Sequence, residues 1–332
     1  MDKTQKAEYI IGLCKEFPDT PTMTLAKKAY KEHPESFINL ENARGAIRYR
    51  RGNKGQASRD NAKKHNEATF RPNGKSGWKV ELPQSVAKQN QNVLLPDGKI
   101  AVLSDIHVPY HDQSALETCL AYLDNYEPTC VYLNGDTADF YNVSRWEKDP
   151  EERDFGAEIR MVREFLSHLR ERYPKAEMFF KVGNHEERYE KYLANKAPEL
   201  FGVTEYRLNK LLHLDDLGFR LVRSKQKAKA GKNLTIIHGH EIYGMNTPVN
   251  FARTLQTKMG VCAIAGHRHS TSEHSYKTAD QQFVHCWSTG CLCDMTPDYA
   301  IVNNWNHGFI TIEKDGNRFQ CDNLRIVDGD VF

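Results

Sequence analysis

The sequence predicts a layered α/β core preceded by a small, basic helical domain. Between residues 99 and 265, short apolar runs alternate with helical patterns, which is typical of buried strands in an α/β sheet. Near the start of the chain, three short helical patterns are followed by a stretch that contains no Ile, Leu or Val. We therefore divide the chain into a helical domain (1–51), a linker or arm (52–98) and a core domain (99–332).

The composition is that of a globular protein with room for a full core. Of the 332 residues, 39% are hydrophobic, which suits one large domain plus a small one. No apolar run approaches the roughly eighteen residues that cross a bilayer, and the start, MDKTQKAEYI, lacks the pattern of a secretory signal. The eight cysteines are scattered and several stand in apolar segments. We expect reduced thiols, no membrane partner and a cytoplasmic location.

The helical domain carries the excess positive charge. Helix-type spacing of apolar residues spans 6–16, 23–32 and about 40–50, and the breakers FPDTPT and HPES lie between these segments. Residues 1–80 contain 17 Lys and Arg against 9 Asp and Glu, a balance of +8, and the remaining 29 against 35 give −6. A basic end of this kind is typical of a contact with nucleic acid or another polyanion, or of a solvated tail.

Three short helices form the outline of a helix-turn-helix unit. Its third helix would present four basic side chains to the phosphates or the major groove of DNA: Arg44, Arg48, Arg50 and Arg51. The alternative is a small helical bundle that binds another protein or only packs on the core domain. Both interpretations remain open at this level.

The core domain begins as alternating strands and helices and ends as strands. Buried strands are predicted at 99–104, 130–134, 178–182, 234–238 and 261–265. Helical segments are predicted between the first three, at about 113–125 and 156–173. Beyond residue 265 the segments SEHSYK, QFVHCW, GFITIE and RFQCDN are expected to form further strands.

Almost every predicted strand is followed at once by residues that bind metal ions. These residues are Asp105 and His107, Asp136 and Asp139, Asn184 and His185, His238 and His240, and His267 and His269. In open α/β sheets the site lies beyond the carboxyl ends of the strands. The five clusters are therefore expected to converge on one crevice.

The types of residue fit a site for two cations. Asp105 and His107 are two residues apart, so in extended backbone both side chains would leave on the same side and grip one cation. Asp136 carries a carboxylate, which can place one oxygen on each of two cations. A mixed nitrogen and oxygen set suits Mn²⁺, Fe or Zn²⁺ better than Mg²⁺ or Ca²⁺, which prefer oxygen alone.

Two such cations, about 3.5–4 Å apart, would activate a bridging hydroxide, orient a phosphate and neutralise charge during an in-line displacement. His185 follows a predicted ligand and is expected to protonate the leaving oxygen or stabilise its charge. Asp139 is expected to orient His185. The pattern thus predicts an enzyme that hydrolyses phosphate esters.

The ordered motifs D-x-H, G-D-x-x-D, G-N-H-E, H-G-H and G-H-x-H resemble those of the calcineurin-like metallophosphoesterases, over about residues 99–313. The resemblance implies a four-layer α/β/β/α sandwich with a two-metal site. It implies a first metal held by Asp105, His107 and His269, a bridging Asp136, and a second metal held by Asn184, His238 and His267. It also implies that His185 is the catalytic histidine, and that Mn²⁺ is the expected metal, with Fe, Zn²⁺ or Ni²⁺ as alternatives.

Details of the fourth, first and second motifs bear on the choice of ligand and on specificity. Both His238 and His240 could fill the fourth motif, and we favour His238 because it ends the strand, which leaves His240 to line the pocket. Val108 and Phe140 stand where the protein Ser/Thr phosphatases carry Gly and Arg, so the chain resembles more closely the nucleases, small phosphodiesterases and enzymes encoded by phages and their bacterial hosts.

Further residues near the motifs are expected to contact substrate. These are Tyr110, His111, Glu187 and Arg188, in addition to His240. A polar and aromatic loop at about 288–307 could act as a lid through Asp294, Tyr299, Trp305 and His307.

The leading hypothesis is a phosphodiesterase that acts on a nucleic acid or nucleotide, with the helical domain as its DNA-binding appendage. One alternative is a phosphomonoesterase that acts on nucleotides or phosphoproteins. Another is a protein that only binds DNA or a partner on this scaffold.

Overall fold

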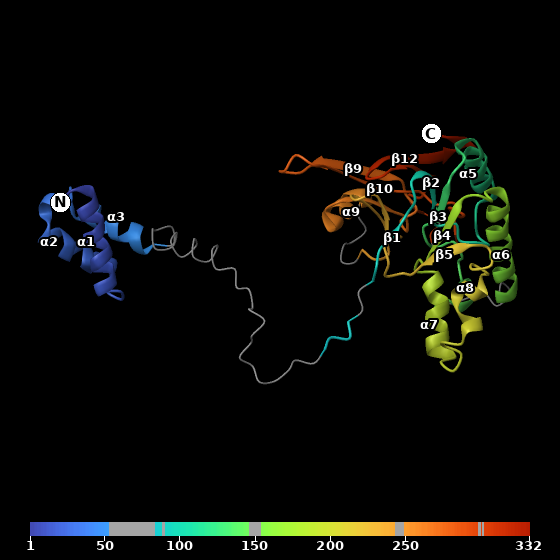
Figure 1. The fold of residues 1–332 in the computed structure, drawn as a ribbon, viewed down its shortest axis with the longest axis horizontal. Helices are drawn as coiled ribbons and strands as arrows, with labels where there is room; N and C mark the ends of the chain where they lie inside the picture. Colours follow the sequence, from blue (N-terminus) through green and yellow to red (C-terminus); the bar gives the residue numbers. More distant parts are fainter. Residues whose placement is uncertain (53–83, 88–89, 146–153, 243–248, 298–299, 301) are drawn as a thin grey trace. The chain divides into compact units, whose positions relative to one another are not determined.

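The computed structural model describes residues 1–52, 84–87, 90–145, 154–242, 249–297, 300 and 302–332. Contacts divide the chain into two compact units, Met1–Val86 and Ala87–Phe332, each with a core of its own (Figure 1). Most of the predicted linker (53–83 and 88–89) lies outside the described residues. In the part of the chain that is described, no helix is long and apolar enough to cross a membrane.

The first unit is a set of short helices around a small apolar core. Its elements are α1 (Lys3–Glu16), α2 (Thr22–Glu32), the 3₁₀ turn η1 (Pro34–Ser36) and α3 (Leu40–Arg51). Asp2 and Gln5 cap the start of α1 reciprocally, and the Asn39 side chain caps α3. The apolar faces meet at Leu25 and Ile47, which are fully buried.

Arg51 has a role inside this unit. Its guanidinium donates to the backbone carbonyls of Phe17 and Thr20, at and just beyond the C-terminal end of α1. The last carbonyls of a helix have no partner within the helix, so a cation near them is stabilising. This differs from the expectation that Arg51 faces phosphates, whereas Arg48 is exposed and Arg44 pairs with Glu41 at 3.0 Å.

The second unit contains two sheets. The seven-stranded sheet has the order β13 (Asp330–Val331), β12 (Arg318–Val327), β11 (His307–Asp315), β2 (Gly98–Leu103), β3 (Cys130–Leu133), β4 (Glu177–Lys181) and β5 (Phe219–Val222). The six-stranded sheet has the order β1 (Val93–Leu94), β6 (Ala228–Ala230), β7 (Leu234–Ile236), β8 (Cys262–Ala265), β10 (Phe283–Ser288) and β9 (Ser272–Lys277).

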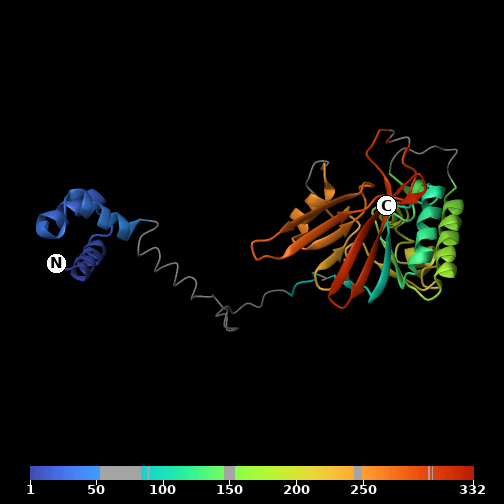
Figure 2. The same cartoon turned by 90° about the horizontal axis from the view of Figure 1, so that it is seen from above.

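Helices cover the outer faces of both sheets. The helices on the side of the seven-stranded sheet are α5 (Gln113–Tyr126), α6 (Phe155–Arg172), α7 (Glu186–Lys196) and α8 (Leu208–Leu211), with the 3₁₀ turns η2 (Tyr141–Val143) and η3 (Thr204–Tyr206). Figures 1 and 2 show α5 and α6 side by side along the seven-stranded sheet, whereas α9 (Phe251–Met259) covers the other one.

The apolar clusters follow these layers. One cluster joins the seven-stranded sheet to α5 and α6, another fills the space between the sheets, and a third joins α9 to the six-stranded sheet. Tyr132 and Phe179 lie in the middle cluster and are fully buried. The fold is therefore the predicted α/β/β/α sandwich.

Residues 93–95 lie inside the sandwich, although they fall in the range predicted to be linker. β1 pairs in parallel with β6, from Val93 opposite Ala228, and Leu95 is buried between the sheets. Two ladder residues are too short a run to give a strand pattern in the sequence. The core domain thus begins before residue 99.

Strand direction places the functional loops together. β2, β3 and β4 run parallel to one another, and so do β7 and β8. Because parallel strands end at the same edge of a sheet, the loops after residues 103, 133 and 181 meet there, as do those after 236 and 265 in the other sheet.

Candidate metal centre

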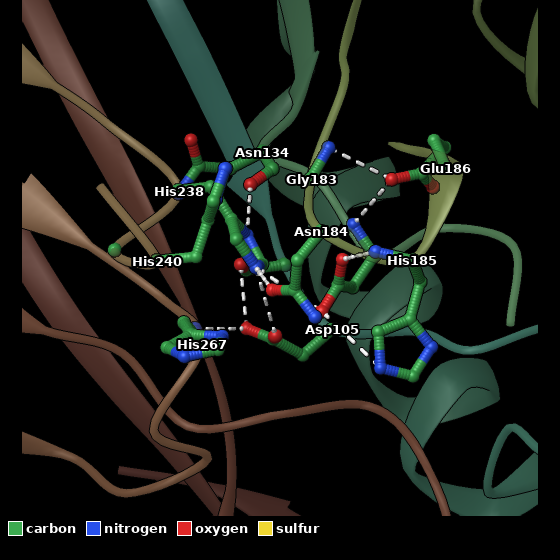
Figure 3. A network of polar contacts seen from close by, with 12 residues as sticks. Asp105, Asn134, Gly183, Asn184, His185, Glu186, His238, His240 and His267 are labelled. Atoms are coloured by element: carbon green, nitrogen blue, oxygen red, sulfur yellow. Dashed lines mark hydrogen bonds and ion pairs between the residues drawn. The ribbon is translucent and has the colours of Figure 1, made fainter. Parts of the chain in front are cut away.

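The loops that follow five strands bring the predicted ligands into one cluster. Figure 3 shows Asp105, Asn184, His238 and His267 converging from different segments of the chain, with His185 at the side. In the described part of the chain, the triplets whose carboxylate and imidazole atoms lie within 4.8 Å of one another include Asp105–His107–Asp136 and Asp136–His238–His267. Asp136 belongs to both triplets, as expected of a residue between two cations.

The backbone at the ligands is not extended, contrary to the expectation for Asp105 and His107. Their φ angles are 56° and 54°, and those of Asp136, His267 and His269 are 50°, 69° and 55°. These values lie in the left-handed region, which side chains other than glycine adopt at some cost. The side chains are therefore directed by sharp turns directly after each strand, and not by the alternating pattern of extended backbone.

In each buried carboxylate, one oxygen accepts hydrogen bonds from the protein and the other points toward the histidines of the cluster. Oδ2 of Asp105 accepts from the hydroxyl of Ser104 at 2.7 Å and from the backbone N–H of His267 at 2.8 Å. Its Oδ1 lies 3.3 Å from Nε2 of His269. The carboxylate is thus anchored, and one oxygen remains directed at the imidazoles.

Asp136 repeats this arrangement. Its Oδ1 accepts from the backbone N–H of His185 at 2.9 Å, and its Oδ2 lies 3.1 Å from Nε2 of His238 and 3.9 Å from Nε2 of His107. Oδ2 alone therefore faces both groups of ligands. The sequence led us to expect that each oxygen of Asp136 binds one cation. The geometry differs, because Oδ1 already accepts a hydrogen bond from the backbone of His185.

Hydrogen bonds on the far nitrogen orient the histidine rings. Nδ1 of His107 lies 2.9 Å from Oδ1 of Asp139, and Nδ1 of His238 lies 2.8 Å from the carbonyl oxygen of Asn134. Both acceptors require a proton on Nδ1, so in the neutral ring the lone pair lies on Nε2. Histidine ligands of metal ions are commonly fixed in this way.

The remaining predicted ligands complete the cluster. Oδ1 of Asn184 lies 3.2 Å from Nε2 of His238. The ring of His267 packs 5.2 Å from that of His238, between centroids, and the ring of His269 lies 5.2 Å from that of His107. His238 itself is fully buried. The structure thus brings all seven predicted ligands together.

The charges within the cluster stabilise one another. Burial raises the pKa of Asp105 and Asp136, but the combined attraction to His238 and the other histidines of the cluster holds both well below their usual range. Burial lowers the pKa of His238, yet attraction to Asp136 and Asp105 raises it to about 10. For His267, burial and repulsion from His238 together lower the pKa to about 3, so its ring is neutral at pH 7.

The cluster fits divalent cations on its own geometry. Among the described residues, Oδ1 of Asp105 and Nε2 of His107 are buried without a hydrogen-bond partner. Buried polar atoms are normally satisfied, and leaving one unpaired costs about 1–3 kcal/mol. A cation between these atoms would satisfy both, and imidazole, carboxylate and amide donors together suit transition metals.

His185 and Asp139 form a second polar group beside the ligands. Nδ1 of His185 lies 2.9 Å from Oδ1 of Asp139, the same oxygen that contacts His107. On the other side of the ring, Nη2 of Arg188 lies 2.8 Å from Nε2 of His185. Because arginine only donates, Nε2 acts as an acceptor in this arrangement.

The predicted substrate contacts occupy different surroundings. Arg188 is held by His185 and by the carbonyl oxygen of Asp139 at 2.9 Å. Tyr110 is 38% exposed, and its ring lies 6.0 Å from that of Tyr141. His111 lines a cavity between α5 and α6, and none of the seven predicted ligands lines this cavity.

His240 lies beside the cluster and outside both ligand triplets of the described residues. Its Nε2 is 3.4 Å from the hydroxyl of Ser224 and 3.8 Å from Oε1 of Glu187. Figure 3 shows it next to His238. The geometry thus agrees with the preference for His238 as the ligand and His240 as a pocket residue.

The loop predicted to act as a lid is partly described. Trp305 packs its ring 4.1 Å from that of His269, and Nε2 of His307 lies 3.0 Å from the carbonyl oxygen of Cys293. Asp294 turns back on its own loop, where it accepts from the N–H of Thr296. Tyr299 lies outside the described residues.

Glu186 is a functional residue that the sequence argument did not single out. This fully buried carboxylate accepts from the backbone N–H groups of Asp136, Thr137, Ala138 and Gly183, at 2.8–3.0 Å. It thereby ties the loop of Asp136 to the loop of Asn184. A carboxylate that serves only backbone donors has no periodic signal in the sequence.

Two motif glycines are required by the close approach of these loops. A Cβ on Gly183 would lie 2.3 Å from Oδ1 of Asp136, and one on Gly266 would lie 1.9 Å from Oγ of Ser104. Both separations are far shorter than van der Waals contact. The glycines of G-N-H-E and G-H-x-H therefore permit the ligands beside them to converge.

Comparisons with known proteins agree with this geometry. A family model described as calcineurin-like phosphoesterase matches residues 98–287, which are 190 of the 332 residues. The gene 54 protein of Mycobacterium phage L5 is 28% identical over 246 residues, covering 70% of this chain and 94% of that protein.

Solved structures also resemble the chain. One is Vacuolar Protein Sorting 29 from Cryptosporidium parvum, with a TM-score of 0.41 and 12% identity over 71% of this chain and 94% of that one. Another is a dimetal phosphatase from Danio rerio, with a TM-score of 0.36 and 11% identity over 68% of this chain and 96% of that one.

Replacement of Glu186 by Gln tests its role in joining the two loops. Glutamine offers one acceptor oxygen and turns an NH₂ group toward N–H donors, so we expect a loss of about 2–4 kcal/mol in the free energy of unfolding. Weaker metal binding should accompany this loss. Thermal unfolding and metal titration measure the two effects, and Glu190→Gln, at an exposed position of the same helix, is the control. Equal stability of the two variants would contradict the assignment.

Proposed function

The chain belongs to the calcineurin-like phosphoesterase family, and on this basis we propose that it hydrolyses phosphodiester bonds of a nucleic acid or nucleotide. The proposal rests on one observation. Seven ligand side chains converge, and some of their own buried atoms have no hydrogen-bond partner in the protein. Oδ1 of Asp105 and Nε2 of His107 are such atoms among the described residues.

The ligands divide between two cations. Asp105, His107 and His269 would hold the first, Asn184, His238 and His267 the second, and Asp136 would contribute to both. When bound, two such cations supply Lewis-acid activation of water and neutralise the charge of the phosphate. Mn²⁺ is the proposed metal because the donors mix nitrogen with oxygen.

The protein's own side chains orient the ring of His185 and determine where its proton is held. Asp139 accepts from Nδ1 of His185, which fixes the ring and places the exchangeable site at Nε2. Burial opposes a charge on this ring, but attraction to Asp136 raises the pKa of His185 above its usual value. A protonated Nε2 would release Arg188 and could donate to a leaving oxygen.

The surroundings of Phe140 favour a diester over a monoester. This side chain is fully buried and packs its ring 5.7 Å from that of Tyr189. The position therefore offers no cation for a phosphate dianion. Arg188, the cation beside His185, is already shared with Asp139, so the site provides little positive charge besides the metals for the second negative charge of a monoester.

The basic first unit supports a nucleic-acid substrate. Residues 1–80 carry the +8 balance, and Arg48 is exposed on α3. None of the seven ligands belongs to this unit. We propose that it contacts DNA phosphates, which would concentrate the substrate near the catalytic unit.

A panel of substrates tests the proposed function. In the presence of Mn²⁺, the chain should cleave a model diester and oligonucleotides faster than a model monoester, and Asp136→Asn should lower every rate at least about a hundredfold, about 3 kcal/mol in the barrier. Metal content and unfolding are measured alongside. Preference for the monoester would indicate a phosphomonoesterase, and normal turnover by folded Asp136→Asn would contradict the two-metal site.

Replacement of His185 separates metal binding from proton transfer. His185→Ala should keep the metals, because the ring is assigned to no cation, yet slow turnover by about a hundredfold. The loss should be larger for diesters with a poor leaving group than for those with a good one, since only the former need protonation. Loss of metal from the variant would show that the role was misplaced.

Deletion of residues 1–86 tests the first unit. The remaining chain contains every ligand, so cleavage of a model diester should be retained. Affinity for duplex DNA should fall, and its dependence on salt should flatten by about 0.9 log unit for each lost phosphate contact. Binding measured at two salt concentrations checks this. Unchanged affinity would favour a unit that docks on another protein.

A further inference from the structure

A basic run lies between β5 and β6. Residues 223–232, RSKQKAKAGK, contain five cations and no acidic residue, in a part of the chain whose balance is negative. Arg223, Lys225 and Lys227 are all exposed. In the described part of the chain, no acidic side chain forms an ion pair with any cation of this run, although Glu187 and Glu241 line the same cavity as Lys225 and Lys227.

Strand directions bring this run to the edge that carries the metal ligands. β5 is parallel to β4, with Val222 opposite Lys181, so its end lies beside the loop of Asn184. β6 is antiparallel to β7, with Ala228 opposite Ile236, so its start lies beside the end of β7, from which His238 follows. The turn 223–227 therefore connects the two sheets along the rim of the metal centre.

The buried ammonium group of Lys181 holds the turn in place. The side chain of Lys181 is fully buried, and its Nζ donates to the carbonyl oxygens of Arg223 at 3.2 Å, Ser224 at 2.6 Å and Gln226 at 3.0 Å. The same ammonium group pairs with Glu241 at 3.1 Å. A buried charge persists only where such partners satisfy it, so the turn has a defined shape.

A cavity lies between the turn and His240, which is beside the cluster. Its volume is about 420 Å³, and its lining includes Lys225, Lys227, Ser224, Glu187, Ile237 and His240. The hydroxyl of Ser224 donates to Glu187, in the first turn of α7 just after His185. His240 lies on the other wall, next to the ligand His238 (Figure 3). The basic side chains thus flank a hollow that extends to His240.

We propose that the turn 223–227 binds backbone phosphates of a nucleic-acid strand next to the phosphate at the metal centre, through Arg223, Lys225 and Lys227. This inference rests on the proposed function and names its substrate class as a strand of several nucleotides. Exposed cations at alternate positions can each meet a phosphate, and positive charge at a rim also steers a polyanion toward the site.

The test compares two variants of the full chain that lose the same charge. The first is Arg223→Gln/Lys225→Gln/Lys227→Gln. The control is Lys175→Gln/Lys196→Gln/Lys258→Gln, at exposed positions before β4, at the end of α7 and in α9. Short fluorescent single strands of DNA and RNA are titrated without divalent metal at two salt concentrations, and thermal unfolding checks each variant.

The variant at the turn should bind both strands at least about tenfold more weakly than the control, with a salt dependence lower by up to about 2 log units for three lost contacts. Lys225→Arg/Lys227→Arg should retain the wild-type affinity. Equal affinity of the turn variant and the control, or tighter binding of an acidic peptide than of either strand, would overturn the inference. Binding through the turn without hydrolysis of any diester would instead reject the proposed function alone.

Discussion

The burial of two negative charges is the constraint on which the catalytic unit depends. Asp105 and Asp136 are 0% and 1% exposed, and a buried carboxylate is stable only when it is paired. In each, one oxygen accepts hydrogen bonds from the protein and the other faces the imidazole rings. The left-handed turns at Asp105 and Asp136 follow from this arrangement, because only a sharp reversal after the strand aims both carboxylates at one place.

The ligands are positioned mainly by residues that would not touch a metal. Asp139 orients two histidines, Asn134 orients a third, and Glu186 ties two loops through four backbone donors. Since these contacts join different loops, they fix the ligand side chains relative to one another. Such preorganisation is what a site needs when its chemistry depends on the placement of charge.

Charge is also divided between the parts of the second unit. The cluster contains the buried carboxylates of Asp105 and Asp136, whereas the turn 223–227 carries the exposed cations Arg223, Lys225 and Lys227. Lys181 connects the two, because its buried ammonium group fixes the turn and pairs with Glu241, close to His240. A substrate with several negative charges would therefore meet cations at the rim and metals at the centre. In the function proposed above, this arrangement would separate recognition of the strand from the chemistry on one phosphate.

The sequence by itself determined the sandwich, the edge at which the site lies and the set of candidate ligands. Each ligand directly follows an apolar strand, and strand direction is a local property that decides where its loop emerges. Tertiary structure alone decided which atoms meet between segments: Glu186 with Asp136, 50 residues away, Arg188 with His185, and, in the first unit, Arg51 with Phe17. Residue patterns record the period of an element and the side it buries, whereas contacts between loops depend on how whole layers pack.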